Sequence, residues 1–160
     1  MTASFHFSRH GQVQAGEDRL SPAGREKLMR VRGLLATHSF TPRIALVSDT
    51  IRCKETGGAL CPEEARVISR PFLQVFSNGD IPELRKQAEG LLVKIFNMFR
   101  RDEDNILIVG HDSVPSILGL VLAEKRGAVI PWENLPDEIR YLEQGCGLLV
   151  QEKEYKYIAP

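Results

Sequence analysis

The sequence contains few cysteines, no excess of charge and no long apolar run, and each absence excludes a class of protein. Cys53, Cys61 and Cys146 are odd in number, which argues against a disulfide framework, and they have no metal-binding spacing. Lys plus Arg and Asp plus Glu both total 21, so no overall field attracts nucleic acid or a membrane surface. No apolar stretch approaches the roughly 20 residues of a membrane span. We therefore expect a soluble protein with reduced thiols and with neither a nucleic-acid nor a membrane partner.

Residues 1–160 have the composition of an ordinary folded chain. Hydrophobic residues make up 42% and charged residues 26% of the sequence, unlike a disordered chain. This length is sufficient to bury a substantial core. The first residues lack the charged and then apolar pattern of a signal peptide. We expect one domain over residues 1–160, located in the cytoplasm.

Short apolar segments alternate along the chain with segments of helical periodicity. Serine and proline at 21–22 are typical of a helix start, and the apolar segment 43–48 is typical of a strand buried on both faces. This alternation predicts an α/β fold, a three-layer α/β/α sandwich with a mostly parallel central sheet. We expect strands at 5–9, 43–48, 65–69, 105–110, 145–151 and 155–159, and helices at 22–35, 50–60, 81–100 and 113–125.

Arginine and histidine side chains follow three of the predicted strands at the point where each strand ends. Arg9 and His10 follow the first strand, Arg52 comes shortly after the second, and His111 follows the apolar segment 105–110. In open α/β sheets, ligands bind just beyond the carboxyl ends of the strands. The sequence therefore predicts that these four side chains meet at one edge of the sheet.

These residue types suit the binding and transfer of a phosphoryl group. The planar fork of an arginine can hold two phosphate oxygens at once. An unprotonated imidazole such as that of His10 is a competent nucleophile, and a second histidine can donate hydrogen bonds to the charge of the transition state. Gly11 would let the backbone bend tightly beside the nucleophile. The place of Arg52 early in a helix favours a phosphate at that helix N-terminus.

Four segments in this order resemble the histidine phosphatase (phosphoglycerate mutase-like) superfamily. They are "RHG" after the first strand, "RLSPAGREKL" at the first helix, "SDTIRCKET" after the second strand and "VGHDS" after a later one, and the closing "LEQGCGLLVQ" fits the family's last strand. The resemblance implies that His10 is the phosphorylated nucleophile. It also implies that Arg9, Arg52 and His111 form the phosphate pocket with His10. The family usually has proline at the position of Asp49, so the loop before Arg52 can differ in shape from that of the family.

The general acid has two candidates in this sequence. Larger members of the family place a glutamate between the second arginine and the second histidine, and here the corresponding stretch is "FSNGDIPELRK". Asp80 is the first candidate and Glu83 the second. The alternative is structural, because Asp80 as N-cap and Glu83 three residues later would make a good capping pair.

We expect neither a metal nor another cofactor. His6 and His10 are four residues apart, a spacing that could chelate a metal on a helix. The alternating apolar residues Phe5 and Phe7 instead indicate a strand, in which four residues span roughly 13 Å. His6 and His38 are then structural or solvent-exposed.

The resemblance implies a phosphatase that acts through a phosphohistidine on His10. The short members of the family, similar to this chain in length, include protein phosphohistidine phosphatases, so we favour a phosphohistidine protein as substrate. The alternatives are a phosphomonoesterase of small metabolites, a mutase, or a phosphate- or phosphoprotein-binding module without turnover. Residues 127–142, which contain Trp132, are the remaining segment able to border the site, and such thin cover disfavours a mutase because it excludes water poorly.

Overall fold

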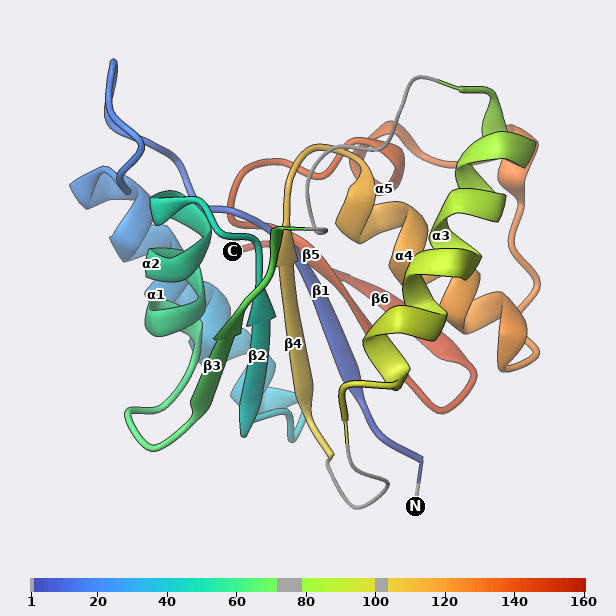
Figure 1. Cartoon of the computed structure of the whole chain (residues 1–160), viewed down its shortest axis with the longest axis horizontal. Coiled ribbons are helices and arrows are strands. Elements are labelled where there is room, and N and C mark those ends of the chain that lie inside the picture. Colours follow the sequence, from blue (N-terminus) through green and yellow to red (C-terminus); the bar gives the residue numbers. More distant parts are fainter. Residues whose placement is uncertain (1, 72–78, 100–103) are drawn as a thin grey trace.

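A six-stranded sheet with helices on both faces forms the centre of the molecule (Figure 1). The computed structural model describes residues 2–71, 79–99 and 104–160. The strands are β1 (Phe5–Arg9), β2 (Ile44–Val47), β3 (Arg66–Ser69), β4 (Ile106–Gly110), β5 (Gly147–Gln151) and β6 (Glu154–Ile158). The helices are α1 (Pro22–Thr37), α2 (Ile51–Leu60), α3 (Ile81–Phe96), α4 (Val114–Lys125) and α5 (Asp137–Arg140), with a 3-10 turn η2 (Trp132–Asn134).

The strand order is β3-β2-β4-β1-β5-β6. The first four strands are parallel, and β5 and β6 pair in the antiparallel sense. From β1 the chain passes over α1 to β2, on the far side of β4, whereas from β4 it passes over α4 to β5, on the far side of β1. The connections leave these neighbouring strands in opposite directions, so a crevice is expected between their carboxyl ends. The predicted mostly parallel α/β/α sandwich is confirmed.

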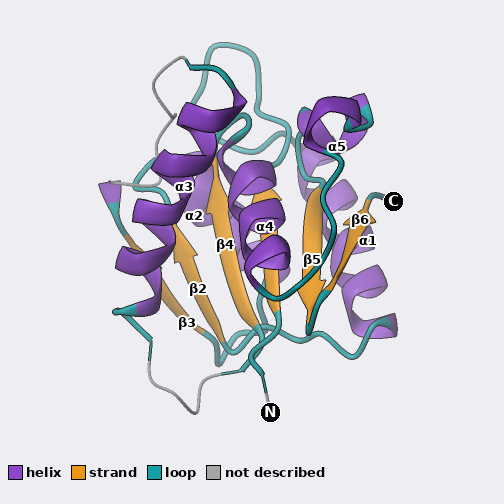
Figure 2. Cartoon of the chain, turned by 90° about the vertical axis from the view of Figure 1, so that its right-hand side faces the viewer, coloured by secondary structure: helices purple, strands orange, loops and turns teal. Residues whose placement is uncertain are grey.

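The sheet separates two apolar cores. Helices α3 and α4 cover one face and α1 and α2 the other, as Figure 2 shows from the side of α3 and α4. Successive residues of a strand point to opposite faces, so Ile106 and Ile108 of β4 enter the first core while Leu107 and Val109 enter the second. Burial on both faces explains why the sequence of β4 is continuously apolar.

The start of α1 follows the predicted capping chemistry. The Ser21 hydroxyl accepts a hydrogen bond from the Gly24 N–H at 3.0 Å, with Pro22 as the first residue of α1.

The short elements η2 and α5 lie within residues 127–142 and were not predicted, because three or four residues carry no periodic pattern. Among the described residues, no helix is long and apolar enough to cross a membrane.

His6 lies in the core on the α1 and α2 side of β1. Its side chain is fully buried, and its ring lies 6.0 Å from the ring of Phe40, centroid to centroid. Burial lowers the pKa of His6 to about 3, although a backbone contact with Leu148 opposes the shift. Of the two roles expected for His6, the structure shows the structural one.

We predict that His6 makes the fold sensitive to acid. An unfolded histidine binds a proton below about pH 6.5, whereas folded His6 binds one only near pH 3, so protonation favours the unfolded chain as the pH falls from 6.5. Between pH 7 and pH 5 the free energy of unfolding should fall by about 2 kcal/mol more in the wild type than in His6→Leu. Urea unfolding at both pH values measures this difference. An equal pH dependence in the two proteins would contradict the prediction.

Candidate active site

The ends of β1 and β4 bring His10 and His111 together. Arg9, the last residue of β1, pairs with Gly110, the last residue of β4, and the residue that follows each of them is a histidine. The two imidazole rings are 5.3 Å apart between centroids, with an angle of 59° between their planes. His10 is 3% and His111 7% exposed. The predicted meeting of the two histidines at one sheet edge is therefore found.

The surroundings of His10 leave one ring nitrogen without a proton. Nδ1 lies 2.8 Å from the Gly11 carbonyl oxygen, which can only accept, so Nδ1 carries the proton and Nε2 has a free lone pair. Burial lowers the pKa of His10 to about 4, and the positive charge of Arg52 contributes in the same direction. His10 is consequently a neutral imidazole at neutral pH, as a nucleophile requires.

Gly11 has little room for a side chain. A Cβ atom on Gly11 would lie 2.8 Å from Leu20 Cδ2 and 2.9 Å from Leu28 Cδ1. Its backbone is not among those with positive φ, so the expected tight bend is not what demands glycine. The Gly11 N–H donates to Thr56 Oγ1 at 2.9 Å, which ties the backbone beside His10 to α2.

Arg9 is held on the carboxyl side of the sheet. One guanidinium nitrogen donates to the Leu142 carbonyl at 2.9 Å, and another forms an ion pair with Asp112 at 3.1 Å. A quarter of the Arg9 side chain stays exposed. Beside it lies a hollow of about 380 Å³ lined by Arg9, Gln12, Lys27, Glu143 and Gln144.

Arg52 is the second residue of α2 and is held by Asp18. Arg52 Nε lies 3.0 Å from Asp18 Oδ1, and the other oxygen of this carboxylate accepts from the Ile51 N–H at 2.9 Å. The expected phosphate position at the helix N-terminus is thus occupied by a carboxylate, because α2 uses Asp18 as its cap. The charge of Arg52 contributes to the lowered pKa of both His10 and His111.

His111 is surrounded by small polar groups. Its Nε2 lies 3.0 Å from Ser48 Oγ and 3.5 Å from both Thr50 Oγ1 and Cys53 Sγ. Burial lowers the pKa of His111, and the charge of Arg52 adds to this effect, while the carboxylate of Asp112 opposes it. His111 is therefore a neutral group that can exchange hydrogen bonds within the site.

All three cysteines are free and buried. Cys53 lies against His111, and burial raises the pKa of its thiol to about 11. Burial also raises the pKa of Cys61 to about 12. The Cys53 thiol therefore stays protonated at neutral pH.

The two candidate acids lie at the start of α3. Asp80 is the N-cap and accepts from the Glu83 N–H at 3.0 Å, while the Glu83 carboxylate accepts from Gln87 Nε2 at 3.3 Å. The capping role of Asp80 is present. No contact between Asp80 and the two site histidines is found in the described part of the chain, and residues 76–78 of the predicted stretch lie outside it. A role of Asp80 or Glu83 as acid remains a prediction.

The segment 127–142 reaches the site at only one end. Trp132 donates its indole N–H to Glu124 at 2.9 Å and lies under the guanidinium of Arg85 at 4.8 Å, so it packs against α3 and α4. Leu142 at the other end contacts Arg9. The expectation that this segment borders the site therefore applies to its carboxyl end, not to Trp132.

Within residues 2–71, 79–99 and 104–160, no group of three or more His, Cys, Asp and Glu side chains could hold a metal ion.

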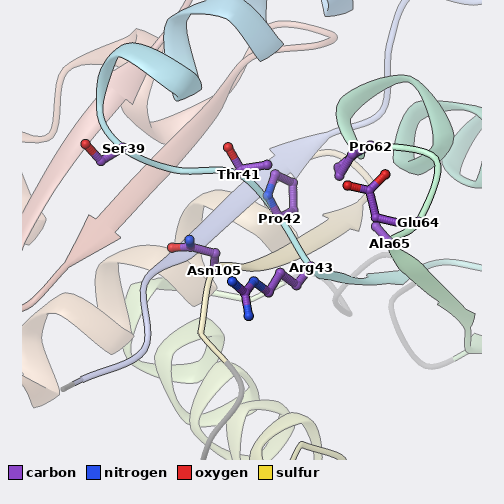
Figure 3. Close-up of a pocket in the computed structure, with 8 residues that line it drawn as sticks. All are labelled: Ser39, Thr41, Pro42, Arg43, Pro62, Glu64, Ala65 and Asn105. Carbon is purple, nitrogen blue, oxygen red and sulfur yellow. The ribbon is translucent and has the colours of Figure 1, made fainter.

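A second hollow lies away from the histidine pair. It has a volume of about 600 Å³ and lies at the opposite, amino-terminal end of the parallel strands (Figure 3). It is lined by Ser39, Thr41, Pro42, Arg43, Pro62, Glu64, Ala65 and Asn105.

Comparison with solved structures identifies the fold. The chain matches a protein named as the phosphohistidine phosphatase SixA of Agrobacterium tumefaciens over 100% of both chains, with a TM-score of 0.67 and 15% identity. It matches a phosphoserine phosphatase of Entamoeba histolytica, solved with 3-phosphoglyceric acid, over 99% of this chain and 98% of that one, with a TM-score of 0.66 and 14% identity.

A third match is the protein histidine phosphatase SixA solved with tungstate, over 98% of this chain and 97% of that one, with a TM-score of 0.56 and 18% identity. No protein-family model and no curated protein sequence matches the chain. The chain has the histidine phosphatase (phosphoglycerate mutase-like) fold, as its motifs predicted, and these structural neighbours are phosphatases.

We predict that removing the charge of Arg52 raises the pKa of His10. A nearby positive charge disfavours the protonated imidazole, so Arg52→Ala should move the titration of His10 upward from about pH 4. Proton–carbon NMR of the imidazole measures both titrations, with His10→Gln identifying the resonance. Arg43→Ala removes an exposed arginine at the opposite end of the sheet and should leave His10 unchanged. A His10 pKa that is the same in Arg52→Ala and in the wild type would contradict the prediction.

Proposed function

We propose that this chain is a phosphatase that acts through a phosphohistidine on His10, with a phosphohistidine protein as its favoured substrate. The observation that carries the proposal is the buried pair of His10 and His111, in which His10 Nε2 keeps a free lone pair. Arg9 and Arg52 supply positive charge beside the pair. The fold shared with phosphatases supports the same conclusion.

The reaction has two displacement steps in this proposal. The Nε2 lone pair of His10 forms a bond to phosphorus while the bond from phosphorus to the leaving atom breaks, and the leaving atom takes the electron pair and a proton. Water then bonds to phosphorus, and the Nε2–phosphorus bond breaks with its electrons returning to His10. Arg9, Arg52 and His111 bind the phosphoryl oxygens and stabilise the charge of both transition states.

Asp80 is the proposed acid that supplies the leaving atom with its proton. It would recover a proton from the attacking water in the second step, which balances the reaction. An imidazole leaving group needs less help from an acid than an alkoxide does. A phosphohistidine substrate is therefore compatible with an acid that also caps a helix.

Short connections favour a large substrate over a small one. Only residues 70–80 join β3 to α3, and residues 126–146 join α4 to β5, so little sequence is left to enclose a small molecule. The Arg9 and Arg52 side chains are 25% and 34% exposed. A phosphate carried on a protein side chain could reach these arginines. The same open site would exclude water too poorly for a mutase to retain its intermediate. The Entamoeba neighbour was solved with 3-phosphoglyceric acid, so a phosphorylated metabolite is the second candidate substrate.

Replacing His10 should abolish turnover and covalent labelling together. We expect His10→Ala to lower kcat by about 10⁴-fold or more, because the covalent route loses its nucleophile. The measurements are hydrolysis of an aryl phosphate and incorporation of acid-labile phosphate. His38→Ala changes a histidine at the carboxyl end of α1 and is the matched control, which should retain both. Substantial activity in His10→Ala would mean that water attacks the substrate directly.

The same assays identify the substrate class. The wild type should release phosphate from a phosphohistidine carrier protein with a higher kcat/KM than from a panel of phosphorylated metabolites. A metabolite turned over far more efficiently would make the chain a metabolite phosphatase. Binding without turnover of any substrate would favour the binding module.

Replacing Asp80 should affect poor leaving groups most. If Asp80 protonates the leaving atom, Asp80→Asn should slow alkyl phosphates by about 100-fold or more and aryl phosphates much less. Glu83→Gln tests the second candidate acid in the same way, and Glu89→Gln, which removes a half-exposed carboxylate further along α3, is the matched control. Equal slowing of both substrate types, with a lower melting temperature, would leave Asp80 only its capping role.

A further inference from the structure

The loop between β1 and α1 is attached to the start of α2. Val13 and Leu20 form an isolated β-bridge that closes the loop. The Leu20 N–H donates to the Glu55 carboxylate of α2 at 2.7 Å, and the Asp18 carboxylate accepts from the Ile51 N–H at 2.9 Å. In Figure 1 the loop rises beside α2 at the upper left. Two carboxylates therefore join this loop to the helix that carries Arg52.

Asp18 makes two kinds of contact with the same helix. One oxygen caps the Ile51 N–H, in place of the Thr50 hydroxyl, which makes no capping bond. The other oxygen lies 3.0 Å from Arg52 Nε. The Asp18 side chain is 40% exposed and the Arg52 side chain 34%. The carboxylate thus contacts both the backbone at the start of α2 and the guanidinium of Arg52.

A carboxylate near a phosphate pocket carries an electrostatic cost. It repels the anion, and its charge acts on His111, whose pKa it raises against the effect of burial. A cap alone could be made by an uncharged serine or asparagine. The ion pair with Arg52 is the contact for which the charge matters.

Ordering Arg52 before the substrate arrives would offset that cost. A free arginine side chain loses rotamer freedom when it is fixed. With Nε held by Asp18, the two Nη groups of Arg52 remain to face oxygens of the phosphate. Thr50 and Cys53, on either side of Arg52 in the chain, each lie 3.5 Å from His111 Nε2, so the start of α2 lies beside the histidine pair.

We propose that Asp18 is a positioning residue that holds the Arg52 guanidinium at the phosphate pocket before phosphate binds. This inference rests on the proposed function, because it assigns a role within the same site. Asp18 acts through Arg52 and does not touch the reacting atoms. Its effect is expected on phosphate binding and on the transition state, and it depends on the presence of Arg52.

The test is a double-mutant cycle of Asp18→Asn and Arg52→Ala. Asparagine keeps an oxygen for the Ile51 N–H and removes the charge at Nε. We expect Asp18→Asn to weaken inhibition by vanadate and to lower kcat/KM for an aryl phosphate, each by roughly threefold, the loss expected for one partly exposed ion pair. In the Arg52→Ala background the same change should have no further effect. Glu17→Gln, an equal loss of charge one residue away, should leave both quantities unchanged.

Other outcomes overturn the inference. A lower melting temperature of Asp18→Asn with unchanged vanadate inhibition would leave Asp18 only as the cap of α2. Equal effects of Asp18→Asn with and without Arg52 would show that it does not act through this arginine. If the wild type turns over no substrate, the proposed function fails, and calorimetric binding of orthophosphate to the same variants still decides the role of Asp18.

Discussion

The parallel pairing of β1 with β4 is the interaction on which the site depends. The Ile106 N–H donates to the Ser4 carbonyl at 2.8 Å at one end of the pair, and the His10 N–H donates to the Gly110 carbonyl at 3.1 Å at the other. A slip of one residue would exchange the two faces of β1 and expel Phe7 from its core. The cores therefore fix the register, and the register places His10 beside His111. The packing of β1 and β4 in the two cores therefore determines where the two histidines of the site lie.

Burial gives the two histidines their chemical character. Both are almost fully covered, and burial is the largest cause of the lowered pKa of each. A buried imidazole is costly unless its nitrogens find partners, and the Gly11 carbonyl and the Ser48 hydroxyl supply them. These partners also fix the ring orientations. The contacts that offset the cost of burying the two imidazoles therefore also hold them in fixed orientations.

Periodic patterns and strand ends were sufficient to predict the sheet and the place of Arg9, His10, Arg52 and His111. Asp18 escaped prediction because it lies in an irregular loop, and its contact with Arg52 depends on how that loop folds back onto α2. The hydrogen-bond partners of Thr56 and Ser48 escaped prediction for a related reason, because a hydroxyl in a sequence does not reveal which group it will bond. For Asp80 the sequence offered a cap and an acid, and only the cap has a local signature.

The Cys53 thiol has a consequence for the tolerance of the site to oxidants. Peroxides and disulfides react with a thiolate, and a thiol with a pKa of about 11 is ionised in only about one molecule in ten thousand at pH 7. The nucleophile proposed here is nitrogen, which peroxide does not readily oxidise. Sulfur therefore sits 3.5 Å from His111 without making the site a redox sensor. Such a protein would keep working under oxidative stress that inactivates enzymes with a catalytic cysteine.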